Sequence, residues 1–325
     1  MARDTLVSIG EALIDFIPDR AGCAFSEVGA FSPKLGGAPA NVCGAYARLG
    51  GKARIITQLG DDPFGHKILD ELRDAGIDVE SIRLTDEANT ALAFVSSGAN
   101  GERTFSFYRK PSADMLYRAE YVTDETMADA YALHFCSVSL GDFPMKQAHI
   151  AAIERARAGG SIVSFDPNLR FPLWSDRNAL HDTVLEFLPL ADAVKISDEE
   201  LEFLTGTDDI HKALPNLLVG NVCLVLYTLG KDGATALTEK QEAHVDGLPG
   251  KAVDTTGAGD GFAGSFLWML HEKGVQRDDL ASLSAETLRA CLRFSNAFCT
   301  RSVQKRGAIA SYPALEDVLG DLKEG

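Results

Sequence analysis

Several features that mark membrane, secreted and nucleic-acid-binding proteins are missing from this chain of 325 residues. No apolar run reaches the roughly 18 residues that a membrane-spanning helix needs, and none near the N-terminus is long enough for a signal peptide. The chain carries no run of Lys or Arg and has a formal net charge of −16, so phosphate backbones and anionic lipids would repel it. The sequence therefore predicts a cytoplasmic protein whose partners are neither nucleic acid nor membrane.

Closely spaced metal or redox ligands are also missing. The six cysteines form no C-x-x-C pair, which predicts buried, reduced thiols in place of disulfides. The seven histidines are dispersed, without an H-E-x-x-H pattern or a His/Cys pair at ligand spacing. A structural transition-metal site is therefore not expected. The cysteines stand at Cys23, Cys43, Cys136, Cys223, Cys291 and Cys299.

What is present is the composition of an ordinary globular protein, with 46% hydrophobic and 24% charged residues. Such values exclude the disordered and fibrous classes. At roughly 150 residues per domain, the length predicts about two units, or one large α/β domain with an insertion.

Short apolar runs rich in β-formers alternate with helical patterns along most of the chain. Strand–helix alternation predicts a doubly wound, mostly parallel sheet flanked by helices. Strands are expected at residues 6–9, 54–57, 132–136, 161–165, 193–196 and 222–228, and helices at 64–75, 258–272, 286–301 and from Ala38 onward.

Two segments break this alternation. Residues 91–95 and 104–108 flank Gly98–Gly101, whose residues are typical of a hairpin turn. The hairpin, together with residues 13–33, does not fit a parallel sheet, and we expect both segments to build a small β-rich lid. The predicted lid comprises residues 13–35 and 89–111, and the predicted main domain comprises residues 1–12, 36–88 and 112–325.

The segment Val253–Phe262 carries the strongest chemical signal. A Thr/Gly-rich turn opens a helix there, and the unpaired N–H groups of a helix N-terminus attract anions. Asp260 would repel a phosphate in this turn unless it had a separate task, and accepting a proton from an attacking hydroxyl is such a task. The alternative is an ordinary loop in which the helix dipole favours an N-terminal Asp.

Two familiar phosphate motifs do not apply to this chain. Gly259-x-Gly261-x-x-Gly264 matches the dinucleotide fingerprint, but Asp260 would face the pyrophosphate and the match lies late in the chain. No G-x-x-x-x-G-K-[ST] sequence exists, which excludes a P-loop enzyme. The alternative hypothesis of an NAD-dependent dehydrogenase depends on the match to the dinucleotide fingerprint alone.

Polar residues near the N-terminus form a second candidate group. Asp15 stands in an apolar run after the first strand, and Gly36-Gly37 leads into a helix whose first turn holds Asn41. Asp and Asn side chains are suitable partners for vicinal sugar hydroxyls. Each could instead be a turn or cap residue.

Three further segments follow predicted strands, where open α/β sheets bind ligands. Arg170 could contact a phosphate. The acidic run from Ser197 to Glu200 could hold Mg²⁺ through water, or could simply begin a helix. The segment Thr228–Gly233 could line a nucleotide or form a hairpin turn.

Taken together, these segments resemble the ribokinase-like (PfkB) carbohydrate kinases over nearly the whole chain. The motifs that carry the resemblance are Gly10–Asp15, Gly36–Asn41, Gly60–Gly65, Thr228–Gly230 and Asp254–Asp260. Within the family, the chain is most similar to the fructokinases, through Phe107–Leu116, Asp166–Arg170 with Pro172–Trp174, and Lys195–Gly206.

The resemblance implies a ribokinase-like fold with a small lid, and transfer of the γ-phosphoryl group of ATP to a sugar hydroxyl. It implies that Asp260 is the general base and that Gly257, Ala258 and Gly259 form an anion hole. The implied substrate-binding residues are Asp15, Gly36, Gly37, Asn41, Phe107, Arg109 and Arg170. The implied nucleotide-binding residues are Asn168, Lys195, Ser197, Thr228, Gly230 and Asn296.

The resemblance also implies two cation sites. Glu200 would hold Mg²⁺ through water, although the Asn of the common Asn-x-x-Glu motif is replaced by Ser197 here. A monovalent cation such as K⁺ would lie among Asp254, Thr256, Ser302, Gly307 and Ser311.

We therefore expect phosphorylation of D-fructose at its 6-hydroxyl by a homodimer that associates through the lid, because apolar strands with an open edge favour pairing. The alternatives are a 2-keto-3-deoxygluconate kinase or another sugar or nucleoside kinase. More distant alternatives are a non-catalytic kinase-like binding protein and an NAD-dependent dehydrogenase.

Overall fold

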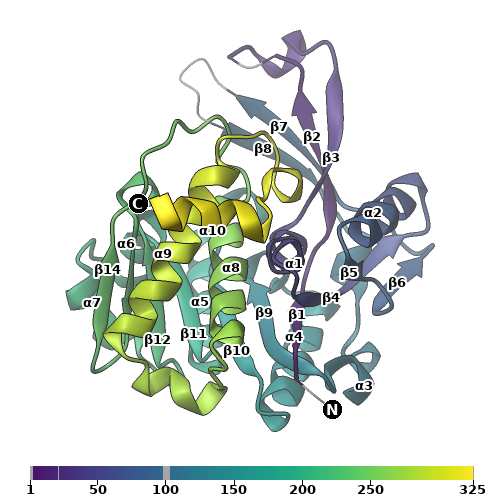
Figure 1. Ribbon diagram of the computed structural model, residues 1–325. Coiled ribbons are helices and arrows are strands. Elements are labelled where there is room, and N and C mark those ends of the chain that lie inside the picture. The colour runs from purple at the N-terminus through teal and green to yellow at the C-terminus, as the bar shows by residue number, and fades with distance from the viewer. Residues whose placement is uncertain (1–2, 21, 98–102, 325) are drawn as a thin grey trace.

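A large sheet forms the body of the molecule in the computed structural model, which describes residues 3–20, 22–97 and 103–324 (Figure 1). Its strands are β1 (Thr5–Ile9), β4 (Lys52–Gly60), β5 (Ile77–Asp78), β6 (Ile82–Thr85), β9 (Ala130–Cys136), β10 (Ile162–Asp166), β11 (Ala193–Ser197), β12 (Leu224–Thr228), β13 (Ala234–Leu237) and β14 (Glu242–Val245). Their spatial order is β14-β13-β12-β11-β10-β9-β1-β4-β5, and β6 pairs with β4.

The predicted parallel sheet is confirmed from β12 to β5, because every ladder between these strands is parallel. The antiparallel strands β13 and β14 were not expected. β13 follows from the Thr228–Gly233 segment, where Gly230 and Gly233 have positive φ angles of 56° and 99° and the chain reverses tightly. A second turn, closed by the bond from the Thr238 amide to the Gln241 carbonyl, leads to β14. The hairpin interpretation of this segment is therefore right.

Helices cover both faces of the large sheet, as a doubly wound fold requires (Figure 1). One core contains the buried sides of α1 (Ala38–Arg48), α2 (Pro63–Asp74), α8 (Ala258–Glu272), α9 (Ala285–Ser302) and α10 (Leu315–Glu324). The other contains those of α3 (Asp124–Met127), α4 (Pro144–Ala158), α5 (Arg177–Phe187), α6 (Asp198–Thr205) and α7 (Ile210–Leu217). Side chains of β1 alternate between them: Leu6 enters the first core, and Val7 and Ile9 enter the second.

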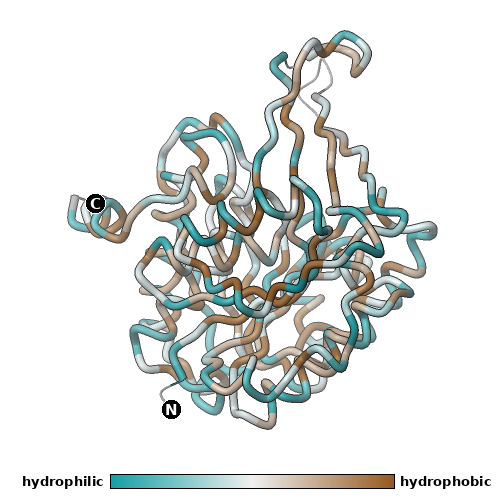
Figure 2. Tube along the Cα trace, turned by 90° about the vertical axis from the view of Figure 1, so that its right-hand side faces the viewer, coloured by the Kyte–Doolittle hydropathy of each residue, from teal (hydrophilic) through white to brown (hydrophobic). Residues whose placement is uncertain are grey.

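A separate small sheet projects from the body, as both views show (Figures 1 and 2). It consists of β2 (Leu13–Pro18), β3 (Phe31–Gly36), β7 (Leu92–Ser97) and β8 (Arg103–Tyr108), in the order β3-β2-β7-β8. The two segments that break the strand–helix alternation thus meet through the parallel pair β2–β7. The predicted turn at Gly98–Gly101 lies outside the described residues.

The cysteines follow the prediction in part. All six are free thiols, but only Cys43, Cys136 and Cys291 are buried, while the other three are partly exposed. Among the described helices, none has the length and apolarity that a bilayer crossing would need.

Helices α1 and α8 approach each other closely because α8 carries a glycine at the contact. A Cβ on Gly264 would lie 2.6 Å from the Val42 carbonyl oxygen and 2.8 Å from Ala45 Cβ. This contact joins two elements that each carry a predicted site residue, Asn41 on α1 and Asp260 on α8.

We expect Gly264→Val to lower the free energy of unfolding by about 1–3 kcal/mol, because the added side chain must push the two helix backbones apart. Urea unfolding measures this change. Gly320→Ala on α10 is the control, since nothing lies within 4 Å of its added Cβ, and it should stabilise the protein by about 0.5–1 kcal/mol. Equal stability of the Val variant and the wild type would contradict the close contact.

Candidate active site

The N-terminus of α8 opens onto a polar cavity. Gly257 precedes the helix with a positive φ of 73°, and a Cβ there would lie 2.6 Å from Ala308 Cβ. The hydroxyl of Tyr312 donates to the Gly257 carbonyl over 2.8 Å and holds the turn in place. The first N–H groups of a helix have no acceptor within the helix, so such a turn can offer donors to an anion. The Ala258 amide already donates to the Thr255 carbonyl over 3.2 Å in this structure.

The cavity has a volume of about 390 Å³ and gathers residues from widely separated segments. The end of β10, the end of β11 and the start of α8 contribute most of its walls, and Phe105 of β8 is the contribution of the small sheet. The predicted residues in its walls are Asn168, Arg170, Lys195, Ser197, Glu200, Thr256, Gly257, Ala258, Gly259 and Asp260.

Asp260 is 8% exposed and lies on the first turn of α8. The side-chain amide of Asn41, on the first turn of α1, donates to Asp260 Oδ2 over 2.8 Å. Burial raises the pKa of Asp260, while the Asn41 hydrogen bond and the nearby Arg170 and Lys195 oppose the rise. A carboxylate with a raised pKa is a better proton acceptor, which suits general base chemistry.

A buried lysine neutralises two carboxylates beside Asp260. Lys195 Nζ lies 3.2 Å from Asp166 Oδ2 and 3.6 Å from Glu200 Oε2. Burial raises the pKa of Asp166 although Lys195 opposes it. Burial also acts to raise the pKa of Glu200, but Lys195 and the hydrogen bonds from Ser197 and Leu169 outweigh it, so this pKa is lowered.

Ser197 and Glu200 also begin helix α6. The Ser197 hydroxyl accepts from the Glu200 amide, and Glu200 Oε2 accepts from the Ser197 amide over 2.8 Å. The Leu169 amide donates to Glu200 Oε1 over 3.2 Å. The two interpretations of this acidic run, a cation site and the start of a helix, are therefore compatible, because Ser197 and Glu200 cap α6 and also line the cavity. Glu199, attributed to the helix dipole, is exposed and lines it too.

Arg170 and Asn168 follow β10 and face the same cavity. Arg170 makes no ion pair with any described residue, and its Nη1 donates only to the neighbouring Leu169 carbonyl. Asn168 has a left-handed backbone conformation with a φ of 42°, and its backbone N–H donates to Asp166 Oδ1. Such a conformation in a non-glycine residue is typical of functional sites.

A second cavity of about 300 Å³ adjoins the first, since both are lined by Thr255, Ala258 and Gly259. Thr228 and Gly230, which were predicted to bind the nucleotide, line it together with mostly apolar neighbours. Asn296 also lines it, with its amide nitrogen donating to the carbonyls of Val245 and Asp246.

Asp15, Gly36, Gly37 and Phe107 form a group of their own outside these walls. A Cβ on Gly36 would lie 2.2 Å from Asp15 Oδ2, so only glycine lets the carboxylate approach. Gly37 has a φ of 105°, and its Cβ would lie 2.5 Å from the Glu11 carbonyl. In the register of the small sheet Asp15 pairs with Ala93 and Ala93 with Phe107, which places all three on one face.

Arg109 lies at the base of the small sheet and does not line either cavity. Its side chain is 4% exposed and forms an ion pair with Asp114. Glu11 lies nearby and lowers the electrostatic cost of the buried guanidinium.

The residues predicted to hold a monovalent cation divide into two groups. Asp254 accepts from the Thr256 hydroxyl over 2.6 Å and from the Gly307 amide over 3.0 Å. Ser302 and Ser311 are buried and bonded to each other over 2.8 Å. In the part of the chain that the structure describes, no cluster of three or more His, Cys, Asp or Glu side chains suits a metal ion.

Asp166 and Glu11 received no role from the sequence. Asp166 is the last residue of β10, so the rule that ligands bind at the carboxyl ends of parallel strands pointed to it. Glu11 carried no such signal, because its partners Ala38, Ser139 and Arg109 are distant in the chain.

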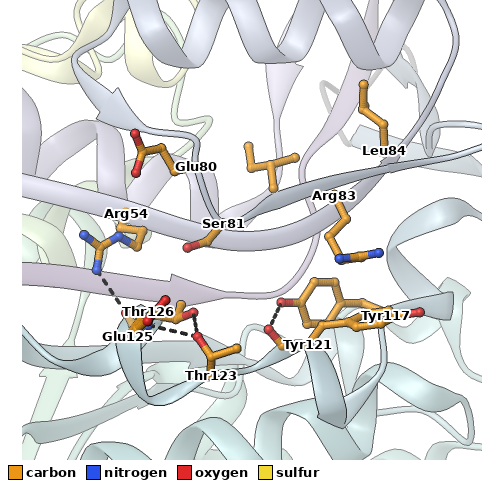
Figure 3. Close-up of a pocket in the computed structure, with 11 residues that line it drawn as sticks. Arg54, Glu80, Ser81, Arg83, Leu84, Tyr117, Tyr121, Thr123, Glu125 and Thr126 are labelled. Carbon is orange, nitrogen blue, oxygen red and sulfur yellow. Dashed lines mark hydrogen bonds between the residues drawn. The ribbon is translucent and has the colours of Figure 1, made fainter.

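A further pocket, of about 520 Å³, lies beside β6 and contains none of the predicted residues (Figure 3). Arg83 lies 3.9 Å from the ring centroid of Tyr121, and Arg54 is held by Asp78 and Asp129 over 2.7 Å each. Both cationic side chains in the walls of this pocket therefore already have partners within the protein.

Comparison with known proteins identifies the family of the chain. Residues 3–315 match the family described as pfkB family carbohydrate kinase. The chain is 42% identical over 324 residues to the "Probable fructokinase-3" of Arabidopsis thaliana, with 99% of this chain and 92% of the relative covered. It is similar to the fructokinase with bound ATP from Xylella fastidiosa (TM-score 0.92, 35% identity, 99% of each chain). It is also similar to the Vibrio cholerae O395 fructokinase with fructose, ADP and a calcium ion (TM-score 0.85, 31% identity, 98% of each chain).

We expect Lys195→Met to destabilise the protein by about 3–5 kcal/mol near neutral pH, because Asp166 and Glu200 would remain buried without a cation. Loss of Lys195 raises the pKa of both carboxyl groups, so the native state binds more protons than the unfolded chain. Stability then falls as pH rises, and the loss in Tm should be larger near pH 8 than near pH 5.5.

Lys52→Met is the control, since the Lys52–Asp4 pair is exposed, and its Tm should match the wild type at both pH values. A pH-independent loss in the Lys195 variant would contradict the electrostatic role.

Proposed function

The chain belongs to the pfkB family of carbohydrate kinases, phosphotransferases with an alcohol group as acceptor, and we propose that it transfers the γ-phosphoryl group of ATP to the 6-hydroxyl of D-fructose. The observation that supports this proposal is the buried Asp260, held by Asn41 and placed beside the amides that begin α8. Fructose is proposed as the acceptor because the fructokinases cited above cover nearly the whole chain.

The sugar would lie between the small sheet and α8. Asp15 and Asn41 bind its hydroxyls, and the Gly36-Gly37 turn leaves room for Asp15 to approach. The attacking hydroxyl gives its proton to Asp260, whose raised pKa keeps it a competent acceptor. Phe105 and Phe107, whose rings stack at 5.8 Å, close the site against water, which would otherwise hydrolyse ATP.

ATP would occupy the two adjoining cavities. The apolar cavity near Thr228, Gly230 and Asn296 accepts the base and ribose, and the shared wall at Ala258 and Gly259 leads the phosphates to the polar cavity. There the amides of Gly257, Ala258 and Gly259 face the negative charge that develops on the transferred group. Arg170, Lys195, Ser197 and Asn168 line the phosphate side.

The described carboxylates form no cluster that would hold a metal ion directly, but Glu200 suits a hydrated Mg²⁺, because hard oxygen donors and water are the ligands it prefers. Both Glu200 oxygens already accept backbone amides, so Glu200 would hold the ion through water. The bound ion would neutralise charge on the phosphates of ATP. We propose that Asp254, Thr256 and Gly307, which hydrogen bonds join, hold K⁺ together with the bonded pair Ser302 and Ser311.

A homodimer through the small sheet is supported by an aromatic cluster on the sheet face opposite Asp15. Phe16 stacks on Phe94 at 4.6 Å, and Phe94 contacts Tyr108 and Phe31. Tyr108 is 63% exposed and Phe25 47%, so a second copy would remove a large apolar patch from water. Sedimentation velocity measures the oligomeric state.

The substrate is tested by measuring ADP release from MgATP with fructose, 2-keto-3-deoxygluconate, ribose, glucose and adenosine, each with and without K⁺. We expect turnover with fructose to exceed that with the other acceptors, and NMR of the product to place phosphate at the 6-position. Greater turnover with another acceptor would support kinase activity but reject fructose as the substrate. ATP binding without turnover on any acceptor would favour a non-catalytic role.

We expect Asp260→Asn to lower kcat by about 10²–10⁴-fold while fructose binding survives, because the variant keeps its shape and loses the proton acceptor. The wild-type rate should fall as pH drops through the raised pKa of Asp260, and this acid limb should be absent from the variant's residual rate. Steady-state kinetics across pH and calorimetric binding of fructose measure both effects. Near-normal turnover in the variant would remove Asp260 from the base role.

A further inference from the structure

A buried ion cluster lies at the base of the small sheet, outside both cavities. It consists of Glu11, Arg109 and Asp114, which are 2%, 7% and 0% exposed. Arg109 donates from Nη2 to the Asp114 carboxylate and from Nη1 to the Val138 carbonyl over 3.5 Å. Its Nε has no acceptor among the described residues but is shielded from solvent as well.

The cluster joins three places where the chain passes between the two sheets. Glu11 lies between β1 and β2, and Arg109 follows β8 directly. Glu11 Oε1 also accepts the backbone amide of Ala38 over 3.3 Å, at the passage from β3 into α1. Glu11 Oε2 accepts the Ser139 hydroxyl over 2.8 Å, which ties the cluster to the body.

The same contacts lead to the proposed catalytic groups. Ala38 begins α1, and Asn41 on its first turn bonds to Asp260 over 2.8 Å. Asp15 lies in β2, the strand that begins directly after Glu11 and Ala12. The cluster is thus bonded to the start of α1 and lies at the root of the strand that carries Asp15.

Charge balance makes Arg109 the essential member. Two carboxylates and one guanidinium share a site closed to water, so removal of Arg109 alone leaves two buried, uncompensated negative charges. Breaking a buried ion cluster in this way is costly, whereas replacing all of its charges with neutral groups of similar shape is often tolerated.

We propose that Arg109 is a positioning residue, which pins the root of the small sheet through its ion pair with Asp114 and through charge attraction to the nearby Glu11, and thereby sets Asp15 and Asn41 relative to Asp260, without touching the sugar. This differs from the substrate contact implied by the family resemblance. The kinetic part of its test rests on the proposed sugar kinase activity; the proposal itself rests on the contacts of the cluster.

The test compares Arg109→Met with the charge-free triple variant Glu11→Gln/Arg109→Met/Asp114→Asn. We expect Arg109→Met to lower kcat/KM for fructose by about 10²-fold through misplacement of the sugar site, with the KM for ATP unchanged. The triple variant should recover to within about tenfold of the wild type. The side-chain oxygen of Gln can still accept the Ala38 amide, and that of Asn can still accept the Ser112 hydroxyl, which donates to Asp114 here.

Hydrogen–deuterium exchange without substrate supplies a second readout. Amides of β2 and β8 should exchange faster in Arg109→Met and return to wild-type rates in the triple variant. Arg155→Met is the matched control, because the Arg155–Asp124 pair lies at the surface, and it should change neither kinetics nor exchange. Thermal unfolding of each variant checks that it is folded.

A folded triple variant as inactive as Arg109→Met would overturn the proposal and assign Arg109 to the sugar. A triple variant that fails to fold would also overturn it, because charge balance would then not suffice. If the wild type shows no fructose-dependent turnover, the proposed substrate fails, and the exchange data alone still decide the role of Arg109.

Discussion

The hydrogen bond between Asn41 and Asp260 is the interaction on which the arrangement of the site depends. It spans 2.8 Å between the first turns of α1 and α8, two helices that approach each other closely at Gly264. The turns at Gly37 and Gly257, both with positive φ angles, set the directions in which α1 and α8 begin. A Cβ at any of these three glycines would lie 2.5–2.6 Å from a neighbouring atom, so a side chain there would displace the helix or the turn that precedes it.

Electrostatics adapts this geometry to an anionic substrate. A chain with a net charge of −16 repels ATP at long range. In the polar cavity, however, Lys195, Arg170 and the amides of α8 stand together with Asp166, Glu200 and Asp260. The buried lysine keeps the carboxylates from repelling one another, while Arg170, which has no ion pair among the described residues, is available to a phosphate.

The two faces of the small sheet differ in chemical character. Asp15 and Phe107 share the face that would cover the sugar, and the opposite face carries the aromatic cluster around Phe94. Because side chains alternate along a strand, one short sheet can offer polar contacts to a ligand and an apolar surface to a second chain. The ion cluster at its root connects the sheet to the body through the Glu11 contacts with Ser139 and Ala38.

Local patterns in the sequence determined the alternating strands and helices, the two segments of the small sheet and the helix N-terminus at Asp260, because periodicity and turn chemistry act over a few residues. The antiparallel addition of β13 and β14 was not predicted, since short strands carry little periodic signal. Only the tertiary structure placed Asp166 beside Lys195, Glu11 beside Ala38, and Arg109 in a buried ion pair instead of a cavity wall. These pairings join residues far apart in the chain, and their energies depend on burial, which is a property of the packed molecule and not of any local run of residues.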